Sequence, residues 1–296
     1  MYILHHQITI TVAAGAAAAA DLIAIDAATT VAVGAGAVTT ITGNLADLAT
    51  VKAAAGITKS GSENVTMSDT AAALTTQTYA ATAGAADILN VGAAGAVTNL
   101  ANLTGFETVN LAGSTTTGDV ITVANGAGVV VNAAAAVAVI LGTGGQTFNG
   151  STGADIVTSS GADIITGGTG AVIDTFNFVK ANSNAASLAT ITDYRGTGLG
   201  ADVINLTDVA TVSGTALSIV DLLGQGSLAA ALNAAALTNL IDNGLSMFVF
   251  GGDTYAFVET TGATATYVAS DFVVKLTGTT GHLIGAAVAG LGFDGV

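Results

Sequence analysis

Aspartates recur at short intervals within a glycine-rich stretch that spans residues 142–178. Residues 150–158, GSTGADIVT, fit the nine-residue pattern G-G-x-G-x-D-x-U-x, in which U is apolar, with Ser151 in place of the second glycine. Asp163 follows Asp155 by eight residues and again precedes apolar side chains. Gly167 opens a third copy, in which Asp174 comes two residues later than the pattern requires.

This combination of residue types is suited to binding a hard metal ion. Glycine lets a turn direct backbone carbonyl oxygens at one spot, because it adopts conformations that other residues avoid. Aspartate adds a carboxylate beside those carbonyls. A site built from oxygen donors favours Ca²⁺, which takes roughly six to eight oxygen ligands. The alternative is that the aspartates only form turns, for which Asp is a common residue.

Residues 142–178 resemble the calcium-binding β-roll of RTX (repeats-in-toxin) proteins. The later FVFGGDTYAFVETTG, at 248–262, resembles the region that follows such repeats in secreted RTX proteins, and NLTGFETVNL, at 102–111, resembles RTX-type bacterial surface-layer proteins. The resemblance implies that carboxylates and turn carbonyls of eight residues bind calcium: Asp155, Asp163, Asp174, Gly150, Gly153, Gly161, Gly168 and Gly170.

The stretch also departs from the family pattern. Gln146 and Val172 stand where aspartates are expected, one repeat has eight residues and another carries an insertion. We therefore expect one or two calcium sites and not a long array. The resemblance further implies export by a type I secretion system through an uncleaved C-terminal signal, and an extracellular location where calcium is abundant enough to fill weak sites.

The elements that position these turns are predicted to be short parallel strands. Apolar segments separated by Gly, Asn and Asp recur from about residue 87 to 175, which is typical of a parallel β-helix or β-roll. We predict a mainly β solenoid with a few short helices and a C-terminal β-rich region. The regions are 1–86 (strands and short helices), 87–178 (solenoid with the RTX-like repeats) and 179–296 (β-rich, with one helix and a secretion-signal-like tail).

Local patterns refine this prediction. Alternation of apolar residues and threonine predicts strands within 1–40, and Gly251-Gly252-Asp253 between two apolar runs predicts a β-hairpin at 247–258. Helices are expected at 44–55, 70–74 and 227–241. Asparagines at the corners of the coils are expected to form side-chain ladders: Asn90, Asn99, Asn110 and Asn132.

Composition excludes several classes of function. The chain has 296 residues, of which 20 are acidic and 5 basic, giving a net charge of −15, so phosphate-binding basic patches for nucleic acid are missing. The absence of cysteine excludes disulfides and thiolate metal sites. The longest apolar run, 129–141, is shorter than the ~20 residues of a membrane span. Arg195 is expected to pair with a carboxylate. Asp202, Asp253 and Asp271 are expected to serve as turn or capping residues, with calcium ligation as the alternative.

No HExxH or GxSxG motif occurs, and we expect a protein that is not an enzyme. Only 8% of residues are charged and 51% are hydrophobic, which predicts apolar surface that copies of the chain cover. The leading hypothesis is an extracellular structural protein that self-assembles, calcium-dependently, into a surface layer or filament, with cell-surface polysaccharide as a further partner. The alternative is a secreted adhesin or a glycan- or ice-binding β-solenoid module, ranked second because threonine is scattered and not placed at a fixed interval.

Overall fold

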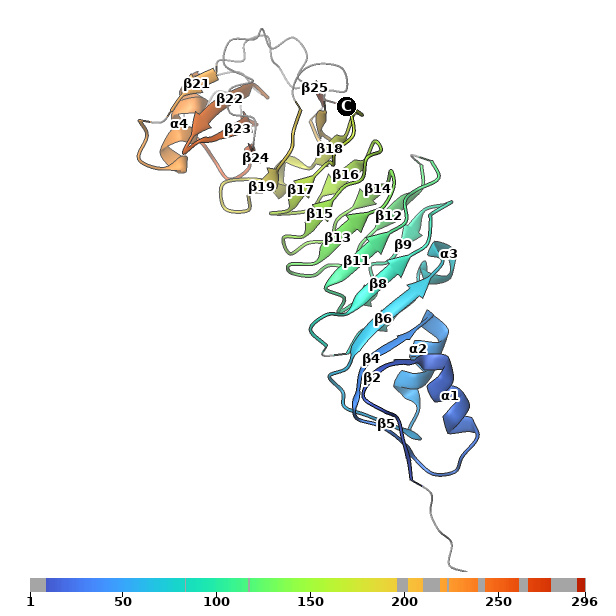
Figure 1. Ribbon diagram of the computed structural model, residues 1–296. Helices are drawn as coiled ribbons and strands as arrows, with labels where there is room; N and C mark the ends of the chain where they lie inside the picture. The colour runs from blue at the N-terminus through green and yellow to red at the C-terminus, as the bar shows by residue number, and fades with distance from the viewer. Residues whose placement is uncertain are drawn as a thin grey trace, which may run out of the picture.

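The structure, a computed structural model, describes residues 9–82, 84–116, 118–195, 202–209, 219–222, 224–238, 243–260, 266–277 and 292–295. It is mainly β, and most strands pair in parallel within long sheets. Figure 1 shows an elongated body in which successive strands lie side by side like rungs, from α1 and α2 at one end to α4 at the other. The predicted fold class is confirmed at this level, and the arrangement is consistent with a β-solenoid.

Two long sheets form the walls of this body. In the described part of the chain the longer sheet has thirteen strands, in the spatial order β2 (Gly15–Ala18), β4 (Val38–Gly43), β6 (Asn64–Asp69), β8 (Ile88–Val91), β11 (Thr108–Leu111), β13 (Val130–Ala133), β15 (Thr147–Asn149), β17 (Ile164–Thr166), β19 (Ala189–Ile191), β24 (Phe272–Leu276), β23 (Asp253–Val258), β22 (Leu245–Phe250) and β21 (Ile219–Asp221). The second has seven, in the order β9 (Thr98–Asn99), β12 (Val120–Thr122), β14 (Ala138–Ile140), β16 (Ile156–Ser159), β18 (Thr175–Phe178), β20 (Val203–Leu206) and β25 (Gly292–Gly295). Two small parallel sheets join β1 (Ile10–Thr11), β3 (Val33–Ala35) and β5 (Ile57–Lys59), and β7 (Tyr79–Ala80) with β10 (Leu103–Thr104).

Stacked apolar side chains fill the space between the walls, because alternate side chains of a strand point to opposite faces of its sheet. The longer sheet contributes a buried column of residues paired in register: Leu89, Val109, Val131, Phe148 and Ile165. The seven-stranded sheet contributes a second column: Ile121, Val139, Val157, Phe176 and Ile204. A single coil cannot bury its inner face alone, so stacking of coils supplies the core.

The coil length matches the repeat read from the sequence. Val131, Phe148 and Ile165 are neighbours in one column and lie 17 residues apart. In the other column Val139 and Val157 lie 18 residues apart. These spacings are close to the combined length of two nine-residue repeats. Each coil of this segment therefore contains two repeats, one leading into the strand of each sheet.

Most of the predicted helices and the hairpin are confirmed. α2 (Leu45–Ala53) begins after Asn44, whose side chain accepts the N–H of Asp47. α3 (Ala71–Leu74) begins after Thr70, which caps it in the same way. α4 (Leu228–Thr238) covers the described part of the third predicted helix, and residues 239–241 lie outside the described residues. β22 and β23 pair in antiparallel fashion around Gly251 and Gly252, as predicted.

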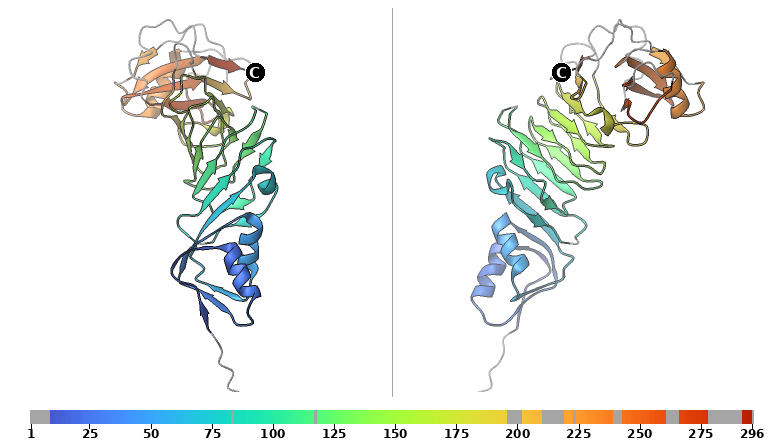
Figure 2. Two further views of the ribbon diagram at one scale, coloured as in Figure 1. Left: turned by 45° about the vertical axis from the view of Figure 1, so that its right-hand side comes forward. Right: turned by 180° about the vertical axis from the view of Figure 1, so that it is seen from behind.

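The prediction of strands throughout 1–40 is wrong for one segment, which forms α1 (Ala19–Ala27). Alanine has the highest helix propensity of all residues, and this helix is rich in it. Ala19 and Leu22 are buried where α1 packs beside α2 and against β2 and β4 (Figure 2). The alternation of apolar residues with threonine does not extend into 19–27, so helix propensity and tertiary burial of one face together favour a helix there. A short 3₁₀ helix, η1 (Lys180–Asn182), follows the repeats.

The asparagine ladder exists, but its position differs from the prediction. Asn110 donates to Asn90 at 2.8 Å and accepts from Asn132 at 2.9 Å, and Asn149 extends the ladder by donating to Asn132 at 2.8 Å. These residues lie within extended strands and not at coil corners. Asn99 is not part of this ladder; its side chain accepts the N–H of Ala101.

None of the helices that the described residues form is long and apolar enough to cross a membrane.

Candidate functional site

The predicted calcium ligands lie on two different edges of the coil. The turns that end at Asp155 and Asp174 lead into β16 and β18 of the seven-stranded sheet, and these turns hold Gly150, Gly153, Gly168 and Gly170. The turn that contains Gly161 and ends at Asp163 leads into β17 of the other wall. The structure therefore brings six of the eight predicted residues to one edge and leaves Gly161 and Asp163 on the other.

The three aspartates occupy equivalent places, each directly before a strand and each buried. Oδ1 of Asp155 accepts the N–H of Val137 at 2.8 Å, from the preceding coil. Oδ1 of Asp163 accepts the N–H of Gln146 at 2.7 Å, also from the preceding coil. Each carboxylate therefore ties its own turn to the coil before it, which is a structural task that requires no metal.

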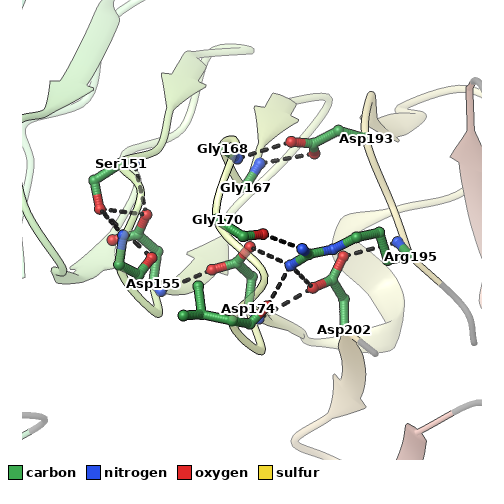
Figure 3. Close-up of polar contacts among 11 residues, drawn as sticks. Ser151, Asp155, Gly167, Gly168, Gly170, Asp174, Asp193, Arg195 and Asp202 are labelled. Atoms are coloured by element: carbon green, nitrogen blue, oxygen red, sulfur yellow. Dashed lines mark hydrogen bonds and ion pairs between the residues drawn. The ribbon is translucent and has the colours of Figure 1, made fainter. Parts of the chain in front are cut away.

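A serine hydroxyl supports each of the first two turns. Ser151 donates to Oδ2 of Asp155 through its N–H at 2.8 Å, and its hydroxyl lies 3.3 Å from the same oxygen (Figure 3). Ser159 repeats the arrangement, with its hydroxyl 2.7 Å from Oδ2 of Asp163. Both serines stand at the second glycine position of the nine-residue pattern. The substitution that weakens the match to the pattern thus supplies a hydrogen-bond donor to the carboxylate.

The Asp174 turn continues the series and adds a cation. Oδ1 of Asp174 accepts the N–H of Asp155 at 2.9 Å, and Oδ1 of Asp202 accepts the N–H of Asp174 at 3.1 Å. Nη2 of Arg195 lies 3.1 Å from Oδ1 of Asp202 and 3.6 Å from Oδ2 of Asp174 (Figure 3). The expectation that Arg195 pairs with a nearby carboxylate is confirmed.

The stacked carboxylates retain uncompensated negative charge. Burial, with a smaller contribution from the negative charges of Asp202 and Asp155, raises the pKa of Asp174 to about 6, although the hydrogen bond from the Asp155 N–H and the charge of Arg195 act in the opposite direction. Burial also raises the pKa of Asp155, against the lowering effect of its hydrogen bonds from Ser151 and Val137. An additional positive charge at this edge would therefore stabilise the ionised carboxylates.

Close packing of turn on turn explains two of the glycines. Gly168 has a φ of +113°, and a Cβ there would lie 1.8 Å from the carbonyl oxygen of Ser151. A Cβ on Gly150 would lie 2.1 Å from the carbonyl oxygen of Gly167. Successive turns of this edge are thus in backbone contact, and only glycine fits between them.

The donors at these turns fit calcium in chemical type. The Asp155 turn brings together a carboxylate, the Ser151 hydroxyl and the Gly153 carbonyl, and the Asp163 turn has the same set with Ser159 and Gly161. Within the described ranges no three His, Cys, Asp or Glu side chains are grouped to hold a metal ion. Each turn supplies one carboxylate, so most of the roughly six to eight ligands of a calcium ion would be neutral oxygens.

Four residues that support these turns were not assigned to the site from the sequence. Ser151 was identified only as a departure from the glycine pattern, and Ser159 was not identified at all. Asp193 accepts the N–H groups of Gly167 and Gly168 at 2.8 and 2.7 Å and so clamps the third turn (Figure 3). Asp202 was expected as a turn or capping residue, and it stands directly before β20 just as Asp155 stands before β16; this equivalent place in the coil was the signal that could have assigned it to the site.

Comparison with known proteins adds no assignment: no protein-family model matches the chain, and no curated protein matches it in sequence.

Proposed function

We propose that this protein is an extracellular, non-catalytic structural protein that self-assembles into a surface layer or filament. One observation carries the proposal: β2 pairs with β4 on one side, and no described strand pairs with its other side. An unpaired strand exposes N–H and C=O groups that a strand of another copy can use.

The β2 edge is a short strand with a register irregularity between Gly15 and Ala16, but it lacks two other usual protections against pairing, charged residues and proline. Edge strands of monomeric proteins carry charges or proline, and residues 10–20 contain neither. The side chains of β2 are alanines, and Ala16 is exposed. A contact between this edge and a different surface of the next copy would be heterologous, and such contacts propagate into a filament or sheet when the rotation between copies does not close a ring.

Mutation of the edge tests assembly directly. Ala16→Lys places a charge on the edge strand, whereas Ala20→Lys places the same charge on an exposed position of α1, four residues away. In electron micrographs we expect assemblies from the wild type and Ala20→Lys and dispersed particles from Ala16→Lys, with equal circular dichroism spectra. Wild-type protein that stays monomeric by light scattering at all concentrations tested would overturn the proposal.

We also propose that the segment with 17- and 18-residue coils is an RTX-like β-roll that binds calcium at the Asp155 and Asp163 turns. Its support is the match between coil length and two nine-residue repeats, the all-oxygen donors and the negative charge at the Asp155 edge. Secretion by a type I system and filling of the turns outside the cell follow from this proposal. Calcium should raise the melting temperature and promote assembly, and EDTA should reverse both. Equal melting curves in millimolar calcium and in EDTA would remove calcium from the proposal.

A second candidate function, a glycan- or ice-binding module, is favoured by the outer face of the thirteen-stranded sheet. Threonine is not scattered on this face: Thr108, Thr147 and Thr190 fall in one register column, at every second coil, with Val130 and Ile164 between them. The asparagine ladder runs parallel to this column. If this face binds such a ligand, Thr147→Lys should abolish retention of the protein on insoluble polysaccharide or its effect on the shape of ice crystals. Assembly through β2 should continue in this variant.

A further inference from the structure

Among the described residues, the hydrogen-bond and ion-pair partners of the Arg195 guanidinium are all oxygen atoms, which form a cage around it (Figure 3). Nη1 donates a hydrogen bond to the carbonyl of Gly170, and Nη2 donates to the carbonyl of Val172. Nη2 also donates to Oδ1 of Asp202 at 3.1 Å and lies 3.6 Å from Oδ2 of Asp174. Two neutral carbonyls and two carboxylates thus converge on one positive charge.

The two carboxylates of the cage are buried, whereas the Arg195 side chain is partly exposed. The side chains of Asp174 and Asp202 are 3% and 2% exposed, and that of Arg195 is 33% exposed. The carbonyls come from the third copy of the nine-residue pattern, the copy whose aspartate is displaced. Oxygen donors of this kind, carboxylate with backbone carbonyl, are the ligands that a hard divalent cation takes.

The third turn also lacks the donor that serves the first two. Ser151 and Ser159 direct their hydroxyls at the carboxylates of Asp155 and Asp163. The equivalent residue of the third turn is Gly168, which has no side chain and is fixed by backbone contact with Ser151. Among the ion pairs of the described residues, only those of Arg195 involve carboxylates of this edge.

We propose that this cage is a cation site whose resident cation is the Arg195 guanidinium, and that it becomes a calcium site when the guanidinium is removed. The cage joins the turn before β18 to the turn before β20, which is where the coil with the displaced aspartate meets the next one. Arg195 therefore keeps this junction folded at calcium concentrations that leave other acidic turns empty. The inference does not require that the protein assembles.

The test compares thermal unfolding of the full chain in EDTA, in millimolar calcium and in millimolar magnesium. Arg195→Ala leaves two buried carboxylates without their cation and should lower the melting temperature in EDTA by about 5 °C or more. Calcium should recover most of that loss and magnesium much less, because magnesium dehydrates reluctantly and demands octahedral geometry. Arg195→Lys keeps one positive charge and should show a smaller loss and a smaller calcium response.

Two further variants separate this inference from the calcium role proposed above. Arg195→Ala combined with Asp174→Asn and Asp202→Asn removes the anionic ligands and should abolish the extra calcium response. If calcium raises the melting temperature of Arg195→Ala but not that of the wild type, the result supports the cation site and removes calcium from the proposed function. An Arg195→Ala variant that gains no more from calcium than the wild type does, or that fails to fold in both EDTA and calcium, would overturn the cation site.

Discussion

The main-chain N–H of Asp155 donates a hydrogen bond to Oδ1 of Asp174, one coil further along the chain, at 2.9 Å. The same contact recurs in both directions, from Val137 to Asp155 and from Asp174 to Asp202. A carboxylate placed directly before a strand thus extends the backbone ladder past the end of that strand. Its removal leaves buried N–H groups without an acceptor.

The Asp155 side chain provides the first prediction. Asp155→Ala leaves the N–H groups of Val137 and Ser151 unsatisfied and should lower the free energy of unfolding by about 2–4 kcal/mol, as two buried donors each lose a partner. Asp155→Asn retains an acceptor oxygen and should cost less. Urea unfolding in EDTA measures both variants. Equal losses for the two would show that charge, and not hydrogen bonding, dominates at this position.

Gly168 provides the second prediction. Gly168→Ala combines an unfavourable positive φ with a Cβ that would lie 1.8 Å from the Ser151 carbonyl oxygen. Gly61, with a φ of +82° and open space around its Cβ position, is the matched control. Gly61→Ala should cost about 1–2 kcal/mol, the price of the left-handed conformation alone. Gly168→Ala should cost clearly more in thermal or urea unfolding, and similar costs would show that the turns are not in tight contact.

The asparagine ladder provides the third prediction. Asn110 makes two ladder hydrogen bonds and Asn149 makes one, as donor to Asn132. A partly exposed hydrogen bond contributes about 0.5–1.5 kcal/mol, so Asn110→Ala should lose about twice the free energy of unfolding that Asn149→Ala loses. Chemical unfolding of both variants checks the ratio. A larger loss for Asn149→Ala would contradict the ladder as the source of stability.

Asp87 provides a prediction on pH dependence. Its side chain is fully buried; Oδ1 accepts the N–H of Val65, and Oδ2 has no hydrogen-bond partner among the described residues. Burial raises the pKa of Asp87, and the nearby charges of Glu107 and Glu63 add to the effect against the lowering hydrogen bond from Val65. The folded protein therefore binds this proton more tightly than the unfolded chain does.

Because the pKa of Asp87 is higher in the folded protein than in the unfolded chain, Asp87 makes the protein less stable as pH rises. The free energy of unfolding should fall as pH rises from the unfolded pKa of Asp, near 4, through the higher folded pKa, and then level off. Asp87→Asn keeps an acceptor for Val65 and removes the charge, so it should be more stable than the wild type at pH 7 and lose this part of the pH dependence. Asp21→Asn, at an exposed position of α1, is the control. The prediction is contradicted if, as pH rises through this range, the free energy of unfolding of the wild type increases relative to that of Asp87→Asn.

The sequence by itself determined the periodic features of this protein. Apolar residues two positions after each aspartate, Val157, Ile165 and Phe176, are buried between the walls as the repeat requires. Caps at Asn44 and Thr70 and the Gly251-Gly252 turn were also predictable, because each depends on residues within a few positions of itself.

Only the tertiary structure decided which residues meet across coils. Arg195 is 21 residues from Asp174 in sequence, and nothing local indicates that its guanidinium closes the third turn. The split of Asp163 from Asp155 follows from the alternation of strands between two walls, which no nine-residue pattern encodes. α1 packs through Ala19 and Leu22 against α2, β2 and β4, and only the tertiary structure fixes these partners. In each case the deciding free energy comes from contacts between segments that are far apart in sequence and adjacent only once the coils have stacked.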